Sequence, residues 1–341
     1  MSSPGELPFI SIVIPARNEE ANMRACLESL SALDYPTDRY EVIIADGNST
    51  DRTREIAESL GAIVVPNEGL TVAYGRHVGF EHAKGDFVVF CDADMAFEPS
   101  WLRNGVKYFD DATVGSIGGP TLVPPGEKPF GRGAAFVFSL AVAGGGSCQA
   151  DTVARVSEAK DIPGGNSMHR REVLEQVMPI ATPLAASEDV EMNWRIRRNG
   201  WRLLHVPDFV VWHYKRPTPA RLARQLHRFG VTRCQCGKIS REMIAPAHLL
   251  VAAWMPLAIG VVIALALLAP TMLLILAVAV GLTLVAFFAT AWVRTRSLPA
   301  ALSALLALGI LLVAWPVGFY QELVLPDRRF RTYLRGRAGS D

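Results

Sequence analysis

GDFVVFCDADM, residues 85–95, places two aspartates, Asp92 and Asp94, directly after an apolar run of four residues. Aspartate is depleted in strands, and two carboxylates this close repel each other unless something cationic lies between them. The stretch therefore predicts a buried strand that ends in either a solvated turn or a metal site.

The first third of the chain alternates short apolar runs with segments of helical periodicity. Strands are expected at residues 9–14, 42–45, 63–65 and 87–90, and helices at residues 19–33, 51–60 and 72–83. Apolar strands that alternate with helices are typical of a Rossmann-like α/β fold, with a mainly parallel sheet covered by helices on both faces. Ligands bind beyond the carboxyl ends of such strands, which is where Pro15, Asp46 and the two aspartates fall.

No glycine-rich phosphate loop of the GxGxxG or GxxxxGK[ST] type follows the first strand. The phosphates of a bound nucleotide would therefore be held by side chains and a divalent cation. A pair of carboxylates suits a hard octahedral cation such as Mg²⁺ or Mn²⁺, which takes oxygen ligands and bridges to phosphates. Because Asp92 and Asp94 lie at the end of a strand in such a sheet, a metal site is favoured over a solvated turn.

Charge is distributed unevenly along the 341 residues. The formal net charge of +1 gives no bias toward nucleic acid, and the five cysteines form no disulfide framework. No Asp, Glu, Lys or Arg occurs from Pro246 to Val293, which is long enough for two crossings of a bilayer. With a further uncharged run at 297–321, transmembrane helices are expected at about 247–269, 271–293 and 298–320. Buried helices of a large soluble core are the alternative.

The positive-inside rule predicts the orientation of a multi-pass protein in the cytoplasmic membrane. No signal peptide is visible, so residues 1–216, which contain the predicted sheet and its ligand site, are expected to form a cytoplasmic domain. Residues 245–323 would return the chain to that side at Arg294 and Arg296 before a third span. A third crossing exports the basic tail, 324–341, which the rule disfavours, so a re-entrant or interfacial third segment stays open.

TPARLARQLHRFG, residues 218–230, predicts a basic amphipathic helix. Thr218 and Pro219 suit a cap and a first helical position, and apolar residues recur at i, i+4 and i+7 with arginines on the other side. Such a helix is typical of one that lies on a membrane surface, and an ordinary surface helix is the alternative. Residues 217–244 are therefore expected to form an interface region. The apolar, glycine-rich residues 130–146 are expected to form a flexible loop that touches lipid or acceptor.

Five motifs, in order, resemble those of glycosyltransferase family 2, inverting enzymes of the GT-A fold. They are SIVIPARNEE (11–20), EVIIADGNSTDRT (41–53), GRHVGFEHAKGDFVVFCDADM (75–95), PGGNSMHRREVL (163–174) and SEDVEMNWRIRRNGWRLLHVP (187–207). The resemblance is strongest to membrane-anchored, succinoglycan-type enzymes of exopolysaccharide synthesis. It implies transfer of a sugar from a nucleotide-diphosphate sugar, expected to be a UDP-sugar, to a lipid-linked or growing glycan.

The resemblance also implies roles for individual residues. Donor-binding residues would be Pro15, Arg17, Glu19, Asp46, Arg76, Asp92 and Arg228. Acceptor-binding residues would be Gly165, Asn166, Glu188, Gln225 and Phe229, the last standing where the related Q-x-x-R-W motif has tryptophan. Asp94, Asp92 and His213 would bind Mn²⁺ or Mg²⁺, and Asp189 would be the general base. Without the resemblance, His213 is a structural histidine, and Ser187, Glu188 and Asp189 are the N-cap and acidic first turn of a helix.

Four rival functions remain. A polyprenyl-phosphate sugar synthase shares the chemistry but needs no strong base, which Asp189 argues against. A processive polysaccharide synthase is expected to have more membrane helices, including some before the catalytic domain. A non-catalytic sugar-nucleotide-binding membrane protein would be expected to lack Asp94 or Asp189, and both are present. A soluble nucleotidyltransferase would have a phosphate loop and no membrane anchor.

Overall fold

The computed structural model describes residues 7–140, 155–180, 184, 186–214 and 218–337. It divides into two compact units. The first contains Met1–Leu122 and Ser147–His213, and the second contains Val123–Gly146 and Tyr214–Asp341. The chain therefore passes between the units three times.

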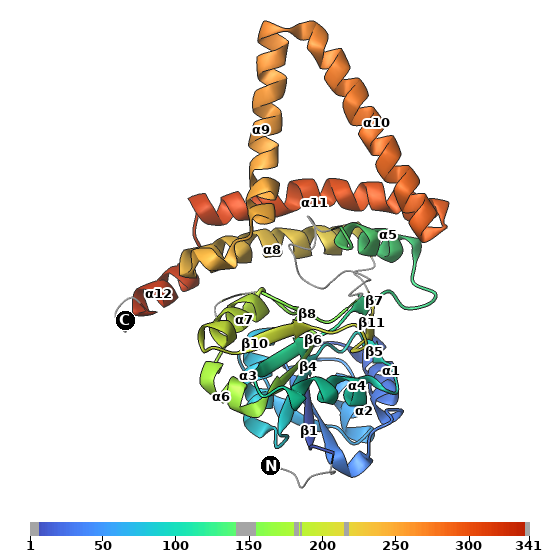
Figure 1. The fold of residues 1–341 in the computed structure, drawn as a ribbon, viewed down its shortest axis with the longest axis vertical. Coiled ribbons are helices and arrows are strands. Elements are labelled where there is room, and N and C mark those ends of the chain that lie inside the picture. Colours follow the sequence, from blue (N-terminus) through green and yellow to red (C-terminus); the bar gives the residue numbers. More distant parts are fainter. Residues whose placement is uncertain (1–6, 141–154, 181–183, 185, 215–217, 338–341) are drawn as a thin grey trace. The chain divides into compact units, whose positions relative to one another are not determined.

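The first unit is built on a mixed β-sheet (Figure 1). Its strands are β1 (Ile10–Ala16), β2 (Tyr40–Asp46), β3 (Ile63–Pro66), β4 (Phe87–Cys91), β5 (Met95–Phe97), β6 (Val114–Gly118), β7 (Thr121–Leu122), β8 (Ser157–Glu158), β9 (Asn166–Arg170), β10 (Arg202–His205) and β11 (Val211–His213). The main sheet has the order β3-β2-β1-β4-β9-β6-β10-β8, and β5, β11 and β7 form a smaller sheet. The first four strands of that order pair in parallel, whereas β9 runs antiparallel to β4 and β6.

Helices cover both faces of the main sheet, as the sequence predicts. They are α1 (Glu20–Ser31), α2 (Thr53–Ser59), α3 (Val72–His82), α4 (Trp101–Val106), α6 (Arg171–Val177) and α7 (Glu188–Arg198), with short 3₁₀ turns η1 (Thr37–Arg39) and η2 (Lys107–Asp110). In β1, Ile12 and Ile14 pack into one core cluster with α1, α2 and α4, while Val13 packs into another with α3, α6 and α7. Because both faces of β1 are buried, its residues are apolar apart from Ser11, whose hydroxyl donates a hydrogen bond to Glu41.

The strand register brings the predicted site residues to one edge of the sheet. Ala16 pairs with Asp46, and Val13 pairs with Phe90, so the chain after β4 leaves the sheet level with the end of β1. Strand β9 begins with Asn166 opposite Cys91, which places the preceding glycines beside the loop that carries Asp92. This antiparallel strand, inserted between β4 and β6, was not predicted from the sequence.

The second unit is helical. Its helices are α5 (Pro129–Phe138), α8 (Pro219–Ile239), α9 (Pro246–Leu268), α10 (Pro270–Thr295), α11 (Leu298–Val324) and α12 (Arg328–Arg337), with η3 (Arg241–Met243) between α8 and α9. Helices α9, α10 and α11 are each long and apolar enough to cross a membrane. The basic helix predicted after residue 217 is α8, and the Thr218 hydroxyl accepts a hydrogen bond from the backbone N–H of Arg221, as expected for its cap.

Helix α5 differs from the flexible loop expected at residues 130–146. Its Gly133 lies so close to α11 that an added Cβ would stand 2.6 Å from the carbonyl oxygen of Ala300. Arg132 donates a hydrogen bond to the carbonyl oxygen of Thr295, at the end of α10. Glycine disfavours helices in isolation, so it is this packing against α10 and α11 that makes the segment helical. Residues 141–146 lie outside the described part of the chain.

Candidate active site

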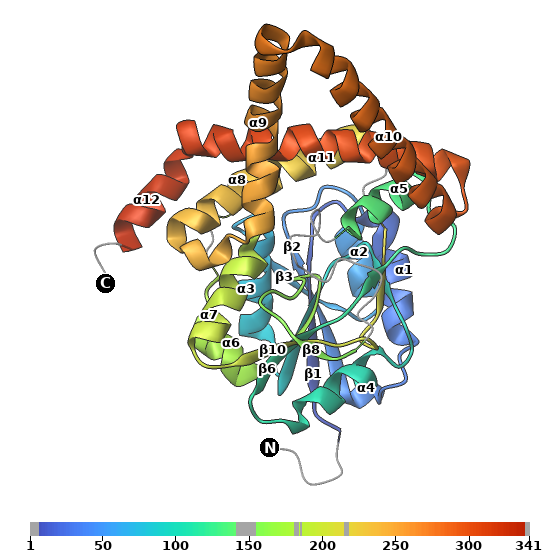
Figure 2. The same cartoon turned by 45° about the horizontal axis from the view of Figure 1, so that its top comes forward.

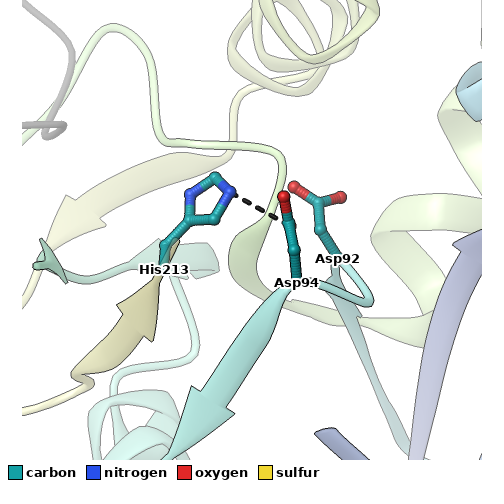
Figure 3. Close-up of side chains that lie close together, drawn as sticks. All are labelled: Asp92, Asp94 and His213. Carbon is teal, nitrogen blue, oxygen red and sulfur yellow. Dashed lines mark ion pairs between the residues drawn. The ribbon is translucent and has the colours of Figure 1, made fainter. Parts of the chain in front are cut away.

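Asp92, Asp94 and His213 form a cluster at the edge of the first unit's sheet (Figure 3). Asp92 follows β4, Asp94 precedes β5, and β11 pairs with β5 so that His213 stands opposite Met95. One potential ligand atom from each of the three residues lies within 4.8 Å of the others. His213 Nε2 is 3.1 Å from Asp94 Oδ1, and the Asp92 side chain is 35% exposed, so the cluster is open to a ligand.

Gly165 lies against this cluster. An added Cβ would stand 2.4 Å from Asp92 Oδ2, a distance that no real Cβ contact shows, so only glycine leaves Asp92 where it is. Gly165 therefore lies beside a carboxylate of the cluster. The sequence had predicted a role for it in acceptor binding, but not this contact with Asp92. The signal in the sequence was the glycine pair in PGGN, residues 163–166.

Replacing Gly165 with alanine is expected to weaken Mn²⁺ binding by about 10- to 100-fold, the usual effect of disturbing the groups that orient a metal ligand. The cause is displacement of Asp92, and Mn²⁺ titration followed by electron paramagnetic resonance measures it. Gly309→Ala is the matched control, since a Cβ there meets nothing within 4 Å. Equal Mn²⁺ affinity in Gly165→Ala and the unmodified protein would contradict the placement of the metal at Asp92.

Asp189 lies on the other side of the glycine pair. The backbone N–H of Gly164 donates to Asp189 Oδ2 at 3.1 Å, and the N–H of Val190 donates to Oδ1 at 2.9 Å. The carboxylate is thus held in one orientation at the first turn of α7. Ser187 occupies the N-cap position of this helix, as expected, but its backbone is left-handed with φ 58° and its hydroxyl does not cap the helix.

Arg76 connects the two sides of the site. Its Nη1 donates to Glu188 Oε1 at 2.7 Å, and its Nη2 lies 3.6 Å from Asp92 Oδ1. Burial raises the pKa of Glu188 and the charge of Asp189 adds to this, although the Arg76 guanidinium opposes it. Removing one partner of such a buried pair leaves the other charge unpaired and costs about 3–5 kcal/mol. Arg76 and Glu188 therefore hold Asp92 and the start of α7 together.

These contacts change two of the expected roles. Arg76 was expected to face a diphosphate, but it is only 3% exposed and its terminal nitrogens contact acidic side chains. Its Nε is one of several buried side-chain atoms among the described residues that have no hydrogen-bond partner. Glu188 was expected to orient the acceptor, and its contact is instead with Arg76. Sequence spacing could not have paired them, because 112 positions separate the two residues.

Asn166, also expected to bind the acceptor, is fully buried. Its Oδ1 accepts from the indole of Trp101 at 3.1 Å, and its Nδ2 donates to the carbonyl oxygens of Pro120 and Phe209. The amide is thus occupied by the fold, where it joins β9 to the segments before β7 and β11. In this structure the partners of the Asn166 amide are therefore groups of the fold, and its acceptor role stays a prediction.

The residues expected at the nucleoside lie at the ends of β1 and β2. Arg17 is exposed, while Pro15 and Glu19 are half-buried. The carboxylate of Asp46 is buried, accepts from the backbone N–H of Ser49 at 3.2 Å, and lies 3.8 Å from Arg54 Nε. These side chains thus line the same sheet edge as the aspartates.

Gln225, Arg228 and Phe229 belong to α8 in the second unit. Arg228 is exposed, Gln225 is half-buried, and Phe229 packs against the apolar cluster of the second unit. Their expected contacts with donor or acceptor therefore stay predictions.

Residues 11–178 match the family model described as glycosyl transferase family 2. These residues form a family 2 glycosyltransferase domain. The resemblance of the motifs to glycosyltransferase family 2 is thereby confirmed, and the chain is a glycosyltransferase of the hexosyltransferase type.

Relatives of known name support this assignment. Glycosyltransferase AglE of Haloferax volcanii is 28% identical over 69% of this chain and 76% of its own length. A Methanococcus voltae relative, named dolichyl N-acetyl-α-D-glucosaminyl phosphate 3-β-D-2,3-diacetamido-2,3-dideoxy-β-D-glucuronosyltransferase, is 25% identical over 66% of this chain and 73% of its own.

A solved structure has a similar fold. The mannosyltransferase PcManGT from Pyrobaculum calidifontis, in complex with GDP-Man and Mn²⁺, has a TM-score of 0.61 and 24% identity, and the match covers 91% of this chain and 88% of that one. The family 2 domain thus has a GT-A-like mixed sheet, followed in this chain by apolar helices that could span a membrane.

Proposed function

We propose that this enzyme transfers a sugar, with inversion, from a UDP-sugar to a hydroxyl of a lipid-linked or growing glycan at the cytoplasmic face of a membrane. One observation carries the proposal: two consecutive glycines separate an Asp-Asp-His cluster from an oriented carboxylate. Gly165 lies against Asp92, and Gly164 donates to Asp189. Asp92, proposed to bind the diphosphate through a metal, and Asp189, proposed to act as the base, therefore flank the segment Gly164–Gly165.

The residues of the cluster fit a divalent cation. Two carboxylates and an imidazole converge at one point, and the absence of a side chain at Gly165 leaves room beside them. Asp92, Asp94 and His213 would hold the ion, and the imidazole favours Mn²⁺ over Mg²⁺, which is usually bound through carboxylates, phosphates and water. A bound ion would supply Lewis-acid stabilisation of the charge on the departing nucleotide diphosphate.

The remaining steps belong to the chain's own residues. Pro15, Arg17, Glu19 and Asp46, at the ends of β1 and β2, would bind the nucleoside. Asp189 would take the proton of the acceptor hydroxyl as that oxygen attacks the anomeric carbon from the face opposite the nucleotide, which inverts the configuration.

The route of the chain and the relatives support a lipid-linked acceptor. The chain enters the second unit directly after Leu122 and directly after His213. His213, a member of the Asp-Asp-His cluster, is therefore adjacent in sequence to the unit that contains the apolar helices. The Methanococcus voltae relative is named for a dolichyl-linked sugar phosphate. Gln225, Arg228 and Phe229, on α8, are proposed to take part in substrate binding.

A donor and acceptor panel tests this function. The full chain in nanodiscs is given UDP- and GDP-sugars, because the structural neighbour holds GDP-Man, with Mn²⁺, Mg²⁺ or a chelator. Acceptors are polyprenyl phosphate and polyprenyl-diphosphate-linked sugars. We expect metal-dependent release of nucleotide diphosphate with a UDP-sugar and a sugar-bearing acceptor, and an inverted anomer in the product. Turnover that survives complete chelation would contradict the proposed metal dependence. Transfer to polyprenyl phosphate alone would favour a polyprenyl-phosphate sugar synthase.

A further inference from the structure

Helix α11 packs along one face only. Its buried residues recur at spacings of three or four along one face: Ala300, Ala301, Ala304, Ala307, Leu311, Trp315, Pro316, Gly318, Phe319 and Glu322. This face meets α5 and α8 at very short range. An added Cβ on Gly230 of α8 would stand 2.0 Å from the Trp315 carbonyl oxygen, and one on Gly318 would stand 2.1 Å from that of His227. Figures 1 and 2 both show α8 and α11 side by side.

Helix α8 is unsuited to the interior of a bilayer. Within its 21 residues it carries five cations and no acidic residue: Arg221, Arg224, Arg228, Arg233 and Lys238. Each cation at the centre of a membrane-spanning helix costs about 2.5–3.5 kcal/mol. Because Arg221, Arg224 and Arg228 are exposed, this face requires water or lipid headgroups.

Polar contacts between side chains hold α11 beside α8. Lys238 Nζ donates to Glu322 Oε1 at 2.7 Å, and Gln235 Nε2 donates to Glu322 Oε2 at 3.2 Å. At the same end of α11, the neighbouring Gln321 forms a hydrogen bond of 2.8 Å with His227 of α8. Two helices packed side by side along their length share one depth, so α11 cannot cross the hydrocarbon while α8 stays at its surface.

The opposite face of α11 is apolar and exposed. It presents Leu302, Leu306, Gly309, Val313 and Val317 at spacings of three or four residues. Helices α9 and α10 differ from α11, because they carry no charge from Pro246 to Val293 and expose apolar side chains all round, such as Leu267 and Leu274. In Figure 1 they rise together as a hairpin from the layer formed by α8 and α11.

We propose that α11, although long enough to cross a membrane, lies in the plane of the membrane surface, with α8 on its aqueous side and acyl chains on its exposed apolar face. Only the α9–α10 hairpin then spans. The partner of this surface is the lipid monolayer that surrounds the hairpin. As a consequence α12, with its exposed Arg328, Arg329 and Arg331, lies on the same side of the membrane as Arg294 and Arg296. This removes the conflict between the basic tail and the positive-inside rule.

Cysteine labelling tests the sidedness. In an active background with the five native cysteines changed to alanine, the single variants Arg296→Cys, Thr332→Cys and Thr271→Cys are treated with a membrane-impermeant maleimide in spheroplasts and in inverted vesicles. We expect residues 296 and 332 to react from one side, and residue 271, at the tip of the hairpin, from the other. Labelling of residues 296 and 332 from opposite sides would overturn the proposal.

Depth measurement tests the orientation independently. Spin labels at Leu302, Leu306, Val313 and Val317 lie on one face, and the first and last are about 22 Å apart along a helix that rises 1.5 Å per residue. An in-plane helix gives all four the same shallow immersion depth by oxygen and nickel-chelate accessibility. A spanning helix gives depths that differ strongly along the series, and that result would overturn the proposal. Labels at Leu250, Leu257 and Leu267 on α9 provide the spanning control.

Discussion

Replacing Asp94 with asparagine is expected to lower sugar transfer by about 10³-fold or more. The substitution keeps the size of the side chain but removes the negative charge nearest to His213, which lies 3.1 Å away. A metal that acts as a Lewis acid contributes several kcal/mol to the transition state, and each 1.36 kcal/mol is a factor of ten in rate. The measurement is the initial rate of nucleotide diphosphate release at a fixed, saturating concentration of Mn²⁺.

The design separates loss of metal from loss of fold. Asp38→Asn, in the exposed turn η1, is the matched control and should keep the full rate. Mn²⁺ titration should show weaker binding in Asp94→Asn, while its melting temperature stays close to that of the control. If Asp94→Asn bound Mn²⁺ normally and retained its rate, the Asp94–His213 contact would be an ion pair of purely structural importance.

Replacing Asp189 with asparagine is expected to lower transfer to a hydroxyl acceptor by about 10²- to 10⁴-fold, the usual contribution of a general base. Asparagine can still accept the hydrogen bond from the Gly164 N–H, but its amide cannot take a proton. The apparent affinity for the donor should change little, since Asp189 approaches the site from the α7 side. The measurements are kcat with a sugar-bearing acceptor and the Kd of the nucleotide.

The choice of acceptor makes this experiment specific. A phosphate acceptor is already ionised and needs no base, so Asp189→Asn should spare any transfer to polyprenyl phosphate. Glu175→Gln, at an exposed position of α6, controls for loss of negative charge. A hydroxyl-transfer rate within about twofold of the unmodified enzyme would exclude Asp189 as the base, because a twofold change in rate corresponds to less than about 1 kcal/mol in the activation barrier.

The local sequence determined the parallel strands of the main sheet because burial on both faces of such a sheet requires apolar strands. Residues 9–14 and 87–90 could therefore be recognised as strands, and they correspond to β1 and β4. The ends of such strands gather at one sheet edge, so Asp46, Asp92 and Asp94 could be assigned to a common site. The charge-free run from Pro246 to Val293 indicated membrane helices equally directly.

The part of the site around Arg76, Glu188 and Asn166 depended on contacts between distant segments. Nothing near Arg76 in the sequence indicates its partner Glu188, and nothing near Asn166 indicates that Trp101 would bond to its amide. The second contact depends on β9 entering the sheet antiparallel between β4 and β6. A polar residue in a motif has the same sequence whether it faces a substrate or the core, and only the tertiary structure separates the two.

The sequence by itself thus determined the α/β class, the carboxylates that can bind a metal, and the apolar length of three helices. Tertiary structure decided that Arg76 and Glu188 pair with each other beside the site. It also decided that α5 belongs to the helical unit and that the apolar helix α11 packs against the charged helix α8. The physical reason is that apolar periodicity and strand ends are local properties, whereas the depth of α11 depends on the charges of its neighbour α8.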